Sequence, residues 1–152
     1  MIADINKGRI FASTQFILLA IIFILSYLLR EEPLNVIKII SYYLLGSGLI
    51  LSIWAFCSFN QKITPNPHPL EKAVLRTNRF YRHVRHPLYL SDLIIIIGWC
   101  LYFYSIISIF FPVVAFIFLT FKMDFEEKLL DKKFPEYKDY KKSSYRLFPS
   151  IY

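Results

Sequence analysis

The sequence predicts an all-α, polytopic membrane bundle of about four transmembrane helices, followed by a helical cytoplasmic tail. Hydrophobic residues make up 56% and aromatic residues 18% of the 152 residues, and both shares exceed the usage of ordinary soluble proteins. The charged residues, 19% of the chain, gather in a few clusters between long uncharged stretches, as in multi-pass membrane proteins. The length fits one domain, so we expect a single membrane domain over residues 1–152.

Two long apolar runs predict the first two membrane helices. Residues 10–29 and 39–59 contain no charged residue, and at about 1.5 Å per residue each run can cross a bilayer core of about 30 Å. Pro33 lies between them and marks the end of the first helix, because proline does not continue a helix. In the second run, Gly46 and Gly48 indicate either close helix packing or a tolerated pair of glycines.

A third apolar region, residues 93–121, is free of charge but too long for one upright span, because as a single helix it would measure about 44 Å. Segment 60–87 carries six Lys and Arg residues, and segment 122–152 carries eight. A hairpin places both basic segments in the cytoplasm, as the positive-inside rule requires, whereas one long helix separates them. We therefore expect spans at 88–104 and 106–121 and cytoplasmic termini.

Polar residues cluster just before the third span, in the stretch RHVRHPLYLSD (Arg82–Asp92). Pro87 suits the first turn of a helix, where no N–H is needed. Asp92 falls inside the helix, where a carboxylate is costly unless it is paired, for example with a nearby arginine, or faces a polar cavity. After the fourth span, Lys122 and Glu126 share a helix face because they are four residues apart. Opposite charges are thus expected to meet in a ligand site at the membrane boundary.

The segments TNRFYRHVRHPLYLSD and EEKLLDKKFPEYKDYKK, joined by a charge-free hairpin, resemble the isoprenylcysteine carboxyl methyltransferase family. That family belongs to a wider group of integral-membrane methyltransferases that includes phospholipid N-methyltransferases. Its pattern is roughly T-x-G-x-Y-x-x-x-R-H-P-x-Y-x-G, a helical hairpin, E-E-x-x-L, and a tail with F-x-x-Y-x-x-Y. The resemblance covers about residues 64–149 and implies an enzyme that uses S-adenosylmethionine as its cofactor.

The resemblance also implies which residues form the site. Cofactor contacts in the family come from the segment before the first tyrosine, from that tyrosine, from H-P-x-Y, and from the first glutamate of E-E. By position, the expected cofactor-binding residues are Ala73, Val74, Leu75, Arg76, Tyr81, His86, Pro87, Leu88, Tyr89 and Glu126. Arg85 and Lys122 are expected at the reacting end, with Lys122 orienting the substrate. No metal is expected, because the histidines and cysteines lack the spacing of metal ligands.

The chain departs from the family pattern at three places. Carboxyl-methylating members carry an arginine at the position of Lys122 that faces the substrate carboxylate, and lysine keeps this charge but loses the bidentate fork. The glycine of the first motif is absent from TNRFY, and we expect Asn78, which tolerates left-handed backbone angles, to take its role shifted by one residue. Ser91 replaces the later glycine and is small enough for a close approach.

The expected function is methyl transfer from S-adenosylmethionine to a lipid-like or prenylcysteine-type carboxylate acceptor that enters from the bilayer. The alternatives are a phospholipid or small-thiol methyltransferase of the same fold, an NADPH-dependent membrane reductase, and a non-catalytic membrane protein. The net charge of +7 is expected to face anionic membrane lipids on the cytoplasmic side, where we place the active site. No recognition motif for nucleic acid accompanies the charge, so no nucleic-acid partner is expected. The sequence does not indicate an oligomeric state.

Overall fold

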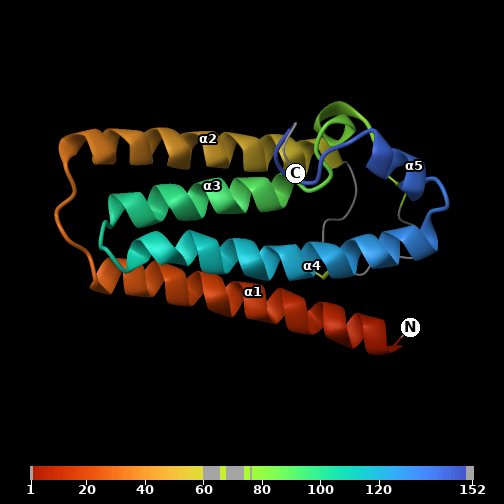
Figure 1. Cartoon of the computed structure of the whole chain (residues 1–152), viewed down its shortest axis with the longest axis horizontal. Coiled ribbons are helices and arrows are strands. Elements are labelled where there is room, and N and C mark those ends of the chain that lie inside the picture. The colour runs from red at the N-terminus through yellow and green to blue at the C-terminus, as the bar shows by residue number, and fades with distance from the viewer. Residues whose placement is uncertain (1, 60–65, 68–73, 76, 150–152) are drawn as a thin grey trace.

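The computed structural model describes residues 2–59, 66–67, 74–75 and 77–149. Five α-helices and two 3-10 helices are formed within these residues, and no strand, only one isolated bridge. They follow the order α1 (Ile2–Leu28), α2 (Asn35–Phe59), η1 (Arg79–Arg82), α3 (Pro87–Tyr102), η2 (Ser108–Phe110), α4 (Phe111–Lys133) and α5 (Tyr137–Lys142). This architecture confirms the predicted all-α membrane bundle (Figure 1).

The helices extend beyond the apolar runs that predicted them. α1 begins at Ile2, well before the predicted start at residue 10, and α4 continues to Lys133 although its apolar run ends at residue 121. Charge decides where a helix can leave the membrane, but not where its hydrogen bonding stops. α4 ends at Phe134, whose extended backbone fits the residue before Pro135. α1, α2 and α4 are long and apolar enough to cross a membrane, and α3 is a shorter apolar helix.

α3 and α4 form the hairpin that the charge pattern predicted. The chain reverses after Tyr102, and Ser105 and Ser108 close the turn by exchanging two N–H···Oγ hydrogen bonds of 3.0 Å each. Pro112 lies in the first turn of α4, where proline is tolerated. The N-terminus, the C-terminal end of α2 and the tail consequently lie at one end of the bundle, opposite the hairpin turn (Figure 1). The membrane side of each end stays a prediction.

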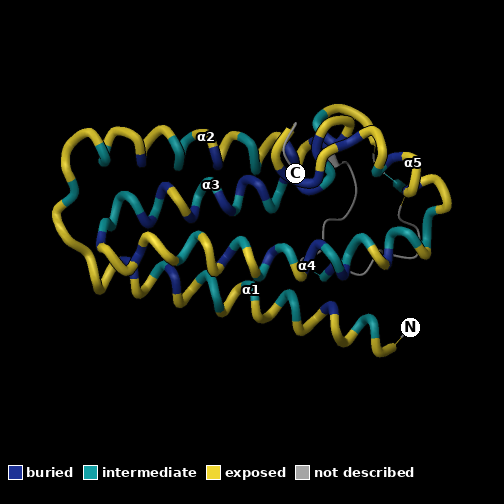
Figure 2. Tube along the Cα trace, viewed as in Figure 1, coloured by how far each residue is buried: buried dark blue, intermediate teal, exposed yellow. Residues whose placement is uncertain are grey.

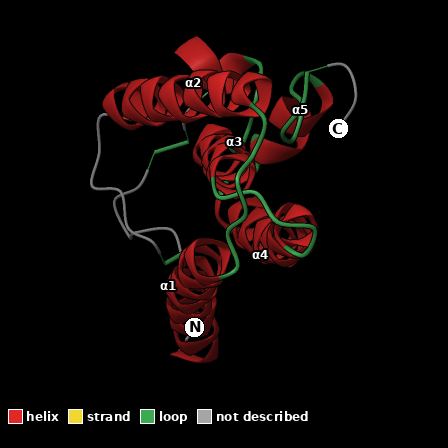
Figure 3. Ribbon diagram, turned by 90° about the vertical axis from the view of Figure 1, so that its left-hand side faces the viewer, coloured by secondary structure: helices red, strands yellow, loops and turns green. Residues whose placement is uncertain are grey.

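α3 is the central helix of the bundle. Seen end-on, it lies between α2 and α4, while α1 lies below α3 and α4 and contacts both, and α5 lies to the side of α3 (Figure 3). The trace of α3 is largely buried, whereas α1 and α2 turn long exposed faces outward (Figure 2). Those faces are apolar, which suits contact with lipid. The helix that carries the predicted H-P-x-Y motif is therefore the one held by most of the others.

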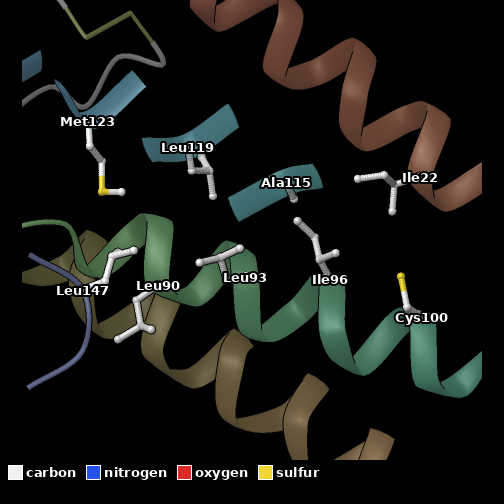
Figure 4. Close-up of a cluster of buried hydrophobic side chains, with 9 residues drawn as sticks. All are labelled: Ile22, Leu90, Leu93, Ile96, Cys100, Ala115, Leu119, Met123 and Leu147. Carbon is white, nitrogen blue, oxygen red and sulfur yellow. The ribbon is translucent and has the colours of Figure 1, made fainter. Parts of the chain in front are cut away.

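The buried core joins three helices and the tail (Figure 4). α3 and α4 supply most of it, α1 contributes one isoleucine, and the tail contributes one leucine. Its members are Ile22, Leu90, Leu93, Ile96, Cys100, Ala115, Leu119, Met123 and Leu147. The tail is thus packed into the same core as the membrane helices, which fixes it over one end of α3.

Two glycines bring α2 and α3 close together. A Cβ atom added to Gly98 would lie 3.0 Å from the backbone nitrogen of Leu45, and one added to Gly48 would lie 2.7 Å from Cγ1 of Ile95. Gly46, by contrast, has open space around its Cα. Of the small residues in α2, Gly48 therefore serves close packing, as small residues do between membrane helices, and Gly46 is merely tolerated.

The left-handed residue before α3 is Arg79, not Asn78. Arg79 has φ of 54°, while Asn78 has an extended backbone with φ of −107°. The expectation that Asn78 takes the role of the family's glycine is therefore wrong. Arg79 is the third residue of TNRFY, the position where the family pattern has glycine, so the backbone shape is kept without that residue. A non-glycine residue in this region costs about 1–2 kcal/mol.

Close α2–α3 packing predicts different effects for two glycine substitutions. Gly98→Leu should destabilise the detergent-solubilised protein by about 2–3 kcal/mol, because overpacking forces the helices apart. Gly46→Leu, the matched control on the open face of α2, should leave the thermal unfolding midpoint nearly unchanged. Equal midpoints for the two variants would contradict the close contact described above.

Candidate active site

Three predicted site residues meet where α3 begins. The Tyr89 hydroxyl donates a 2.8 Å hydrogen bond to Oε2 of Glu126 on α4. His86 stacks on Tyr89, with ring centroids 5.4 Å apart and an interplanar angle of 11°, and its Nδ1 lies 3.8 Å from the same Glu126 oxygen. Pro87 is the first residue of α3 and follows His86, the N-cap residue. Glu126 keeps 25% of its side chain exposed, so its carboxylate remains open to a ligand.

The neighbouring carboxylate, Glu127, is enclosed by cationic and imidazole groups. Its Oε1 accepts a 3.1 Å hydrogen bond from Nε of Arg85, lies 3.2 Å from Nε2 of His86, and is 3.3 Å from Nε of Arg146. The side chains of Glu127, Arg85 and Arg146 are only 13%, 11% and 10% exposed. Charges this far from water need partners. Glu127 is the carboxylate shared by the two arginines, and Arg146 also pairs with Asp124, its Nη2 lying 2.5 Å from Oδ1.

The tail is bonded directly to the segment that precedes α3. Val84 and Tyr145 form a parallel bridge, and the Arg85 backbone N–H donates to the Tyr145 carbonyl at 2.8 Å. The Arg85 guanidinium also donates to the carbonyls of Lys141 and Ser144. Arg85 therefore serves the tail in this structure, and its predicted role at the reacting end stays a prediction.

Two tyrosines add a second bond between the tail and the loop. The hydroxyl of Tyr140 donates to the backbone carbonyl of Tyr81. Burial raises the pKa of Tyr140 to about 12 and also raises the pKa of Tyr81 above its ordinary value. Both phenols consequently stay neutral at physiological pH, and Tyr140 keeps the proton that its hydrogen bond requires.

Deeper in the bundle, a polar cluster links α1 to α3 and α4. The ammonium of Lys122 donates to Oε1 of Gln15, and Nε2 of Gln15 donates to Oδ2 of Asp92 at 3.0 Å. Lys122 is only 1% exposed and holds its Nζ 5.0 Å from the centroid of the Tyr89 ring. Asp92 is thus paired by Gln15 of α1, and not by a nearby arginine.

A small cavity lies beside this polar cluster, between α1, α3 and α4. Gln15 and Asp92 form its polar lining, and the remaining walls are apolar. Those walls are Leu18, Leu19, Ile96, Ala115, Phe118 and Leu119. Its volume is about 10 Å³, which is room for about one water molecule. The cavity is therefore a gap beside the polar cluster and not a space for a ligand chain.

The predicted site residues fall into three groups. His86, Pro87, Tyr89 and Glu126 are brought together at the start of α3, and Lys122 lies beneath them against the Tyr89 ring. Tyr81, buried in η1, is close enough to interact electrostatically with Glu126 and Tyr89. Of the others, Leu88 accepts a hydrogen bond from Ser91 through its carbonyl, Leu75 is half-buried, and Val74 is exposed. Ala73 and Arg76 lie outside the described residues.

Sequence reasoning missed the partners that hold these residues. In the sequence, Glu127 is recognisable only as the second member of a carboxylate pair, and Arg146 only as part of a basic tail. Gln15 was present as an interruption of an apolar run, and Asp92 as an unpaired carboxylate in another. A polar residue in a membrane helix signals that a partner exists, but the sequence does not say that these two are partners.

Chemically, the arrangement offers one open carboxylate, a stacked imidazole–phenol pair and one buried ammonium. The carboxylate and the aromatic faces suit a ligand that is both cationic and planar. The ammonium suits an anionic group. Within the described parts of the chain, no group of three or more His, Cys, Asp or Glu side chains is placed to hold a metal ion.

Comparison with known proteins identifies one family. The sequence pattern of the family described as Phospholipid methyltransferase matches residues 36–137, which is more than half of the chain. The match includes α2, α3, α4 and the residues that meet at the start of α3. No curated protein and no solved structure matches the chain.

The Glu127 cluster predicts that the tail depends on one carboxylate. Glu127→Gln should loosen residues 137–148 and destabilise the folded protein by about 3 kcal/mol, because nearly buried Arg85 loses its counter-charge and Arg146 keeps only Asp124. Hydrogen exchange of the tail amides measures the effect. Asp139→Asn is the control, because Asp139 pairs only with exposed Lys142 and its loss should leave the tail protected. A tail equally protected in both variants would show that Glu127 does not hold it.

Proposed function

We propose that this chain, which belongs to the phospholipid methyltransferase family, transfers a methyl group from S-adenosylmethionine to a lipophilic acceptor at the cytoplasmic face of a membrane. Membership of this family indicates a methyltransferase. The long apolar helices of the chain suit an integral membrane protein. Methyl transfer is favoured over the NADPH-dependent reduction considered from the sequence, because the matched family is one of methyltransferases.

The observation that carries the proposal is the meeting of His86, Tyr89 and Glu126 at one end of α3. These residues come from two motifs more than thirty positions apart. The fold brings Tyr89 within hydrogen-bond distance of Glu126 and places Nδ1 of His86 3.8 Å from the same carboxylate. The partly exposed carboxylate of Glu126 fits the ribose hydroxyls or the ammonium of S-adenosylmethionine. The stacked His86 and Tyr89 rings fit its planar and cationic parts. The residues present therefore suit this cofactor.

The reaction asks little of the protein beyond alignment. The bound cofactor would supply a methyl group already activated by a sulfonium. Glu126 would hold the cofactor, and Tyr89, fixed by its bond to Glu126, would limit the movement of that carboxylate. The burial of His86 and Pro87 keeps water from the inner side of the site. Catalysis in this proposal is chiefly proximity and orientation.

The acceptor that we favour carries a carboxylate on a lipophilic chain, as a prenylcysteine does. The buried ammonium of Lys122 lies under the Tyr89 ring, where a cation would orient the oxygens of the acceptor's carboxylate. That carboxylate is already ionised, so no base is needed. The lipophilic chain of such an acceptor would stay in the bilayer against the exposed apolar faces of the helices. An aminophospholipid is the second candidate, favoured by the description of the matched family.

The active site is proposed to face the cytoplasm. Segments 60–87 and 122–152 carry fourteen of the eighteen Lys and Arg residues, and the described parts of both lie at the end of the bundle where His86 and Glu126 meet (Figure 1). The positive-inside rule assigns that end to the cytoplasmic side. The acceptor would then react at the headgroup level of the inner leaflet.

Cofactor binding should depend on Glu126. Glu126→Ala should weaken the binding of S-adenosylhomocysteine by about 1.5–3 kcal/mol, the scale of a lost hydrogen bond to a charged group. Isothermal titration of the detergent-purified protein measures it. Glu136→Ala, which removes an exposed glutamate beside α5, is the control and should bind as the parent does. Parent-like affinity of Glu126→Ala would show that this glutamate does not hold the cofactor.

Lys122 should distinguish the two acceptor classes. With a farnesylcysteine whose amine is acetylated, Lys122→Met should lower turnover per cofactor-binding site at least tenfold, because a desolvated charge-assisted contact is worth about 1.5–3 kcal/mol. Lys122→Arg should preserve turnover, since it restores the charge and adds a bidentate fork. If an aminophospholipid is the acceptor instead, Lys122→Met should be nearly silent, which would exclude the carboxylate proposal.

A further inference from the structure

Two side chains, Gln15 and Glu126, could accept a hydrogen bond from the ammonium of Lys122. It bonds to Oε1 of Gln15, which comes from α1. Glu126 lies four residues later on the same helix, where a lysine and a glutamate ordinarily pair, yet its Oε2 accepts from Tyr89 instead. The structure therefore keeps apart the two side chains on α4 that are best placed to neutralise each other.

Gln15 has the geometry to maintain this separation. Its amide uses both ends, accepting from Lys122 through Oε1 and donating to Asp92 through Nε2 at 3.0 Å. Lys122 is only 1% exposed, so water does not compete for its ammonium. A buried ammonium without an acceptor is costly, and removal of Gln15 would drive it toward the nearest carboxylates, Glu126 on its own helix and Asp92 on α3.

We propose that Gln15 is a positioning residue: it holds the Lys122 ammonium away from Glu126 and so leaves the Glu126 carboxylate available to the cofactor. The inference rests on the proposed function, in which Glu126 binds S-adenosylmethionine. It also gives a role to α1, which lies before residues 36–137, the part of the chain that the family pattern matches. In this arrangement α1 contributes to the cofactor site without touching the cofactor.

The test is a cycle of variants read by the binding of S-adenosylhomocysteine to the purified protein. Gln15→Met removes both hydrogen bonds at similar size and should weaken binding roughly tenfold, because the released Lys122 ammonium then pairs with Glu126 as well as with Asp92. Lys122→Met alone should bind nearly as tightly as the parent. The double variant Gln15→Met with Lys122→Met should recover most of the lost affinity, because the competing ammonium is gone.

Recovery of binding in the double variant would distinguish a positioning role of Gln15 from a purely structural role in joining the helices. If Gln15 only joins α1 to the bundle, the double variant should bind as weakly as Gln15→Met, or more weakly. Gln15→Glu keeps an oxygen acceptor for Lys122 and should bind within about threefold of the parent, which is under 1 kcal/mol. Ser13→Ala is the control on α1, because Ser13 is exposed and bonds only to carbonyls of its own helix.

Failure of the inference and failure of the proposed function give different results. Parent-like affinity of Gln15→Met, or no recovery in the double variant, overturns the positioning role while the parent still binds the ligand. A parent protein that binds no S-adenosylhomocysteine overturns the proposed function, and the positioning role falls with it. Thermal unfolding of each variant in the same detergent shows which of them are folded when binding is measured.

Discussion

The end of the bundle that carries the candidate site depends on the pairing of buried charge around Glu127. Its carboxylate meets Arg85 from the segment before α3, His86 at the start of α3, and Arg146 from the tail. Any one of these groups would be costly in its nearly buried position without the others. Because Arg85 and His86 precede α3, Glu127 lies on α4 and Arg146 belongs to the tail, the shared carboxylate fixes α3, α4 and the tail relative to one another.

Once this end is fixed, the two adjacent glutamates have different roles. Glu127 pairs with residues that hold the structure together, whereas Glu126 bonds to one phenol. The side chain of Glu126 is 25% exposed, about twice the 13% of Glu127. The same division applies to the cations: Arg85 and Arg146 hold the tail, and Lys122 lies deeper, beside the cavity. The residues left open to a ligand are therefore those that the structural network does not use, which supports the proposed division between cofactor and acceptor.

The two outer helices are attached to the central pair by different means. α2 lies against α3 through Gly48 and Gly98, where the backbones approach closely and no polar bond is needed. α1 is joined by the apolar contact of Ile22 and by Gln15, whose amide bridges α3 and α4. Packing between membrane helices gains little from hydrophobicity, so small residues and polar bridges take its place. Because the Gln15 bridge lies beside the candidate site, it can also affect the position of Lys122 in that site.

The sequence by itself determined the all-α membrane fold and the hairpin after the third apolar helix, because these follow from local hydropathy and charge. That His86, Tyr89 and Glu126 belong together was implied by the resemblance of the motifs to a known family. The sequence did not determine that α1 extends to Ile2, that Arg79 takes the left-handed backbone, or that Gln15 pairs with Asp92 and Lys122. Those features were decided by tertiary structure, because a buried polar group signals only that a partner is required, while the packing of the helices decides which residue comes within reach.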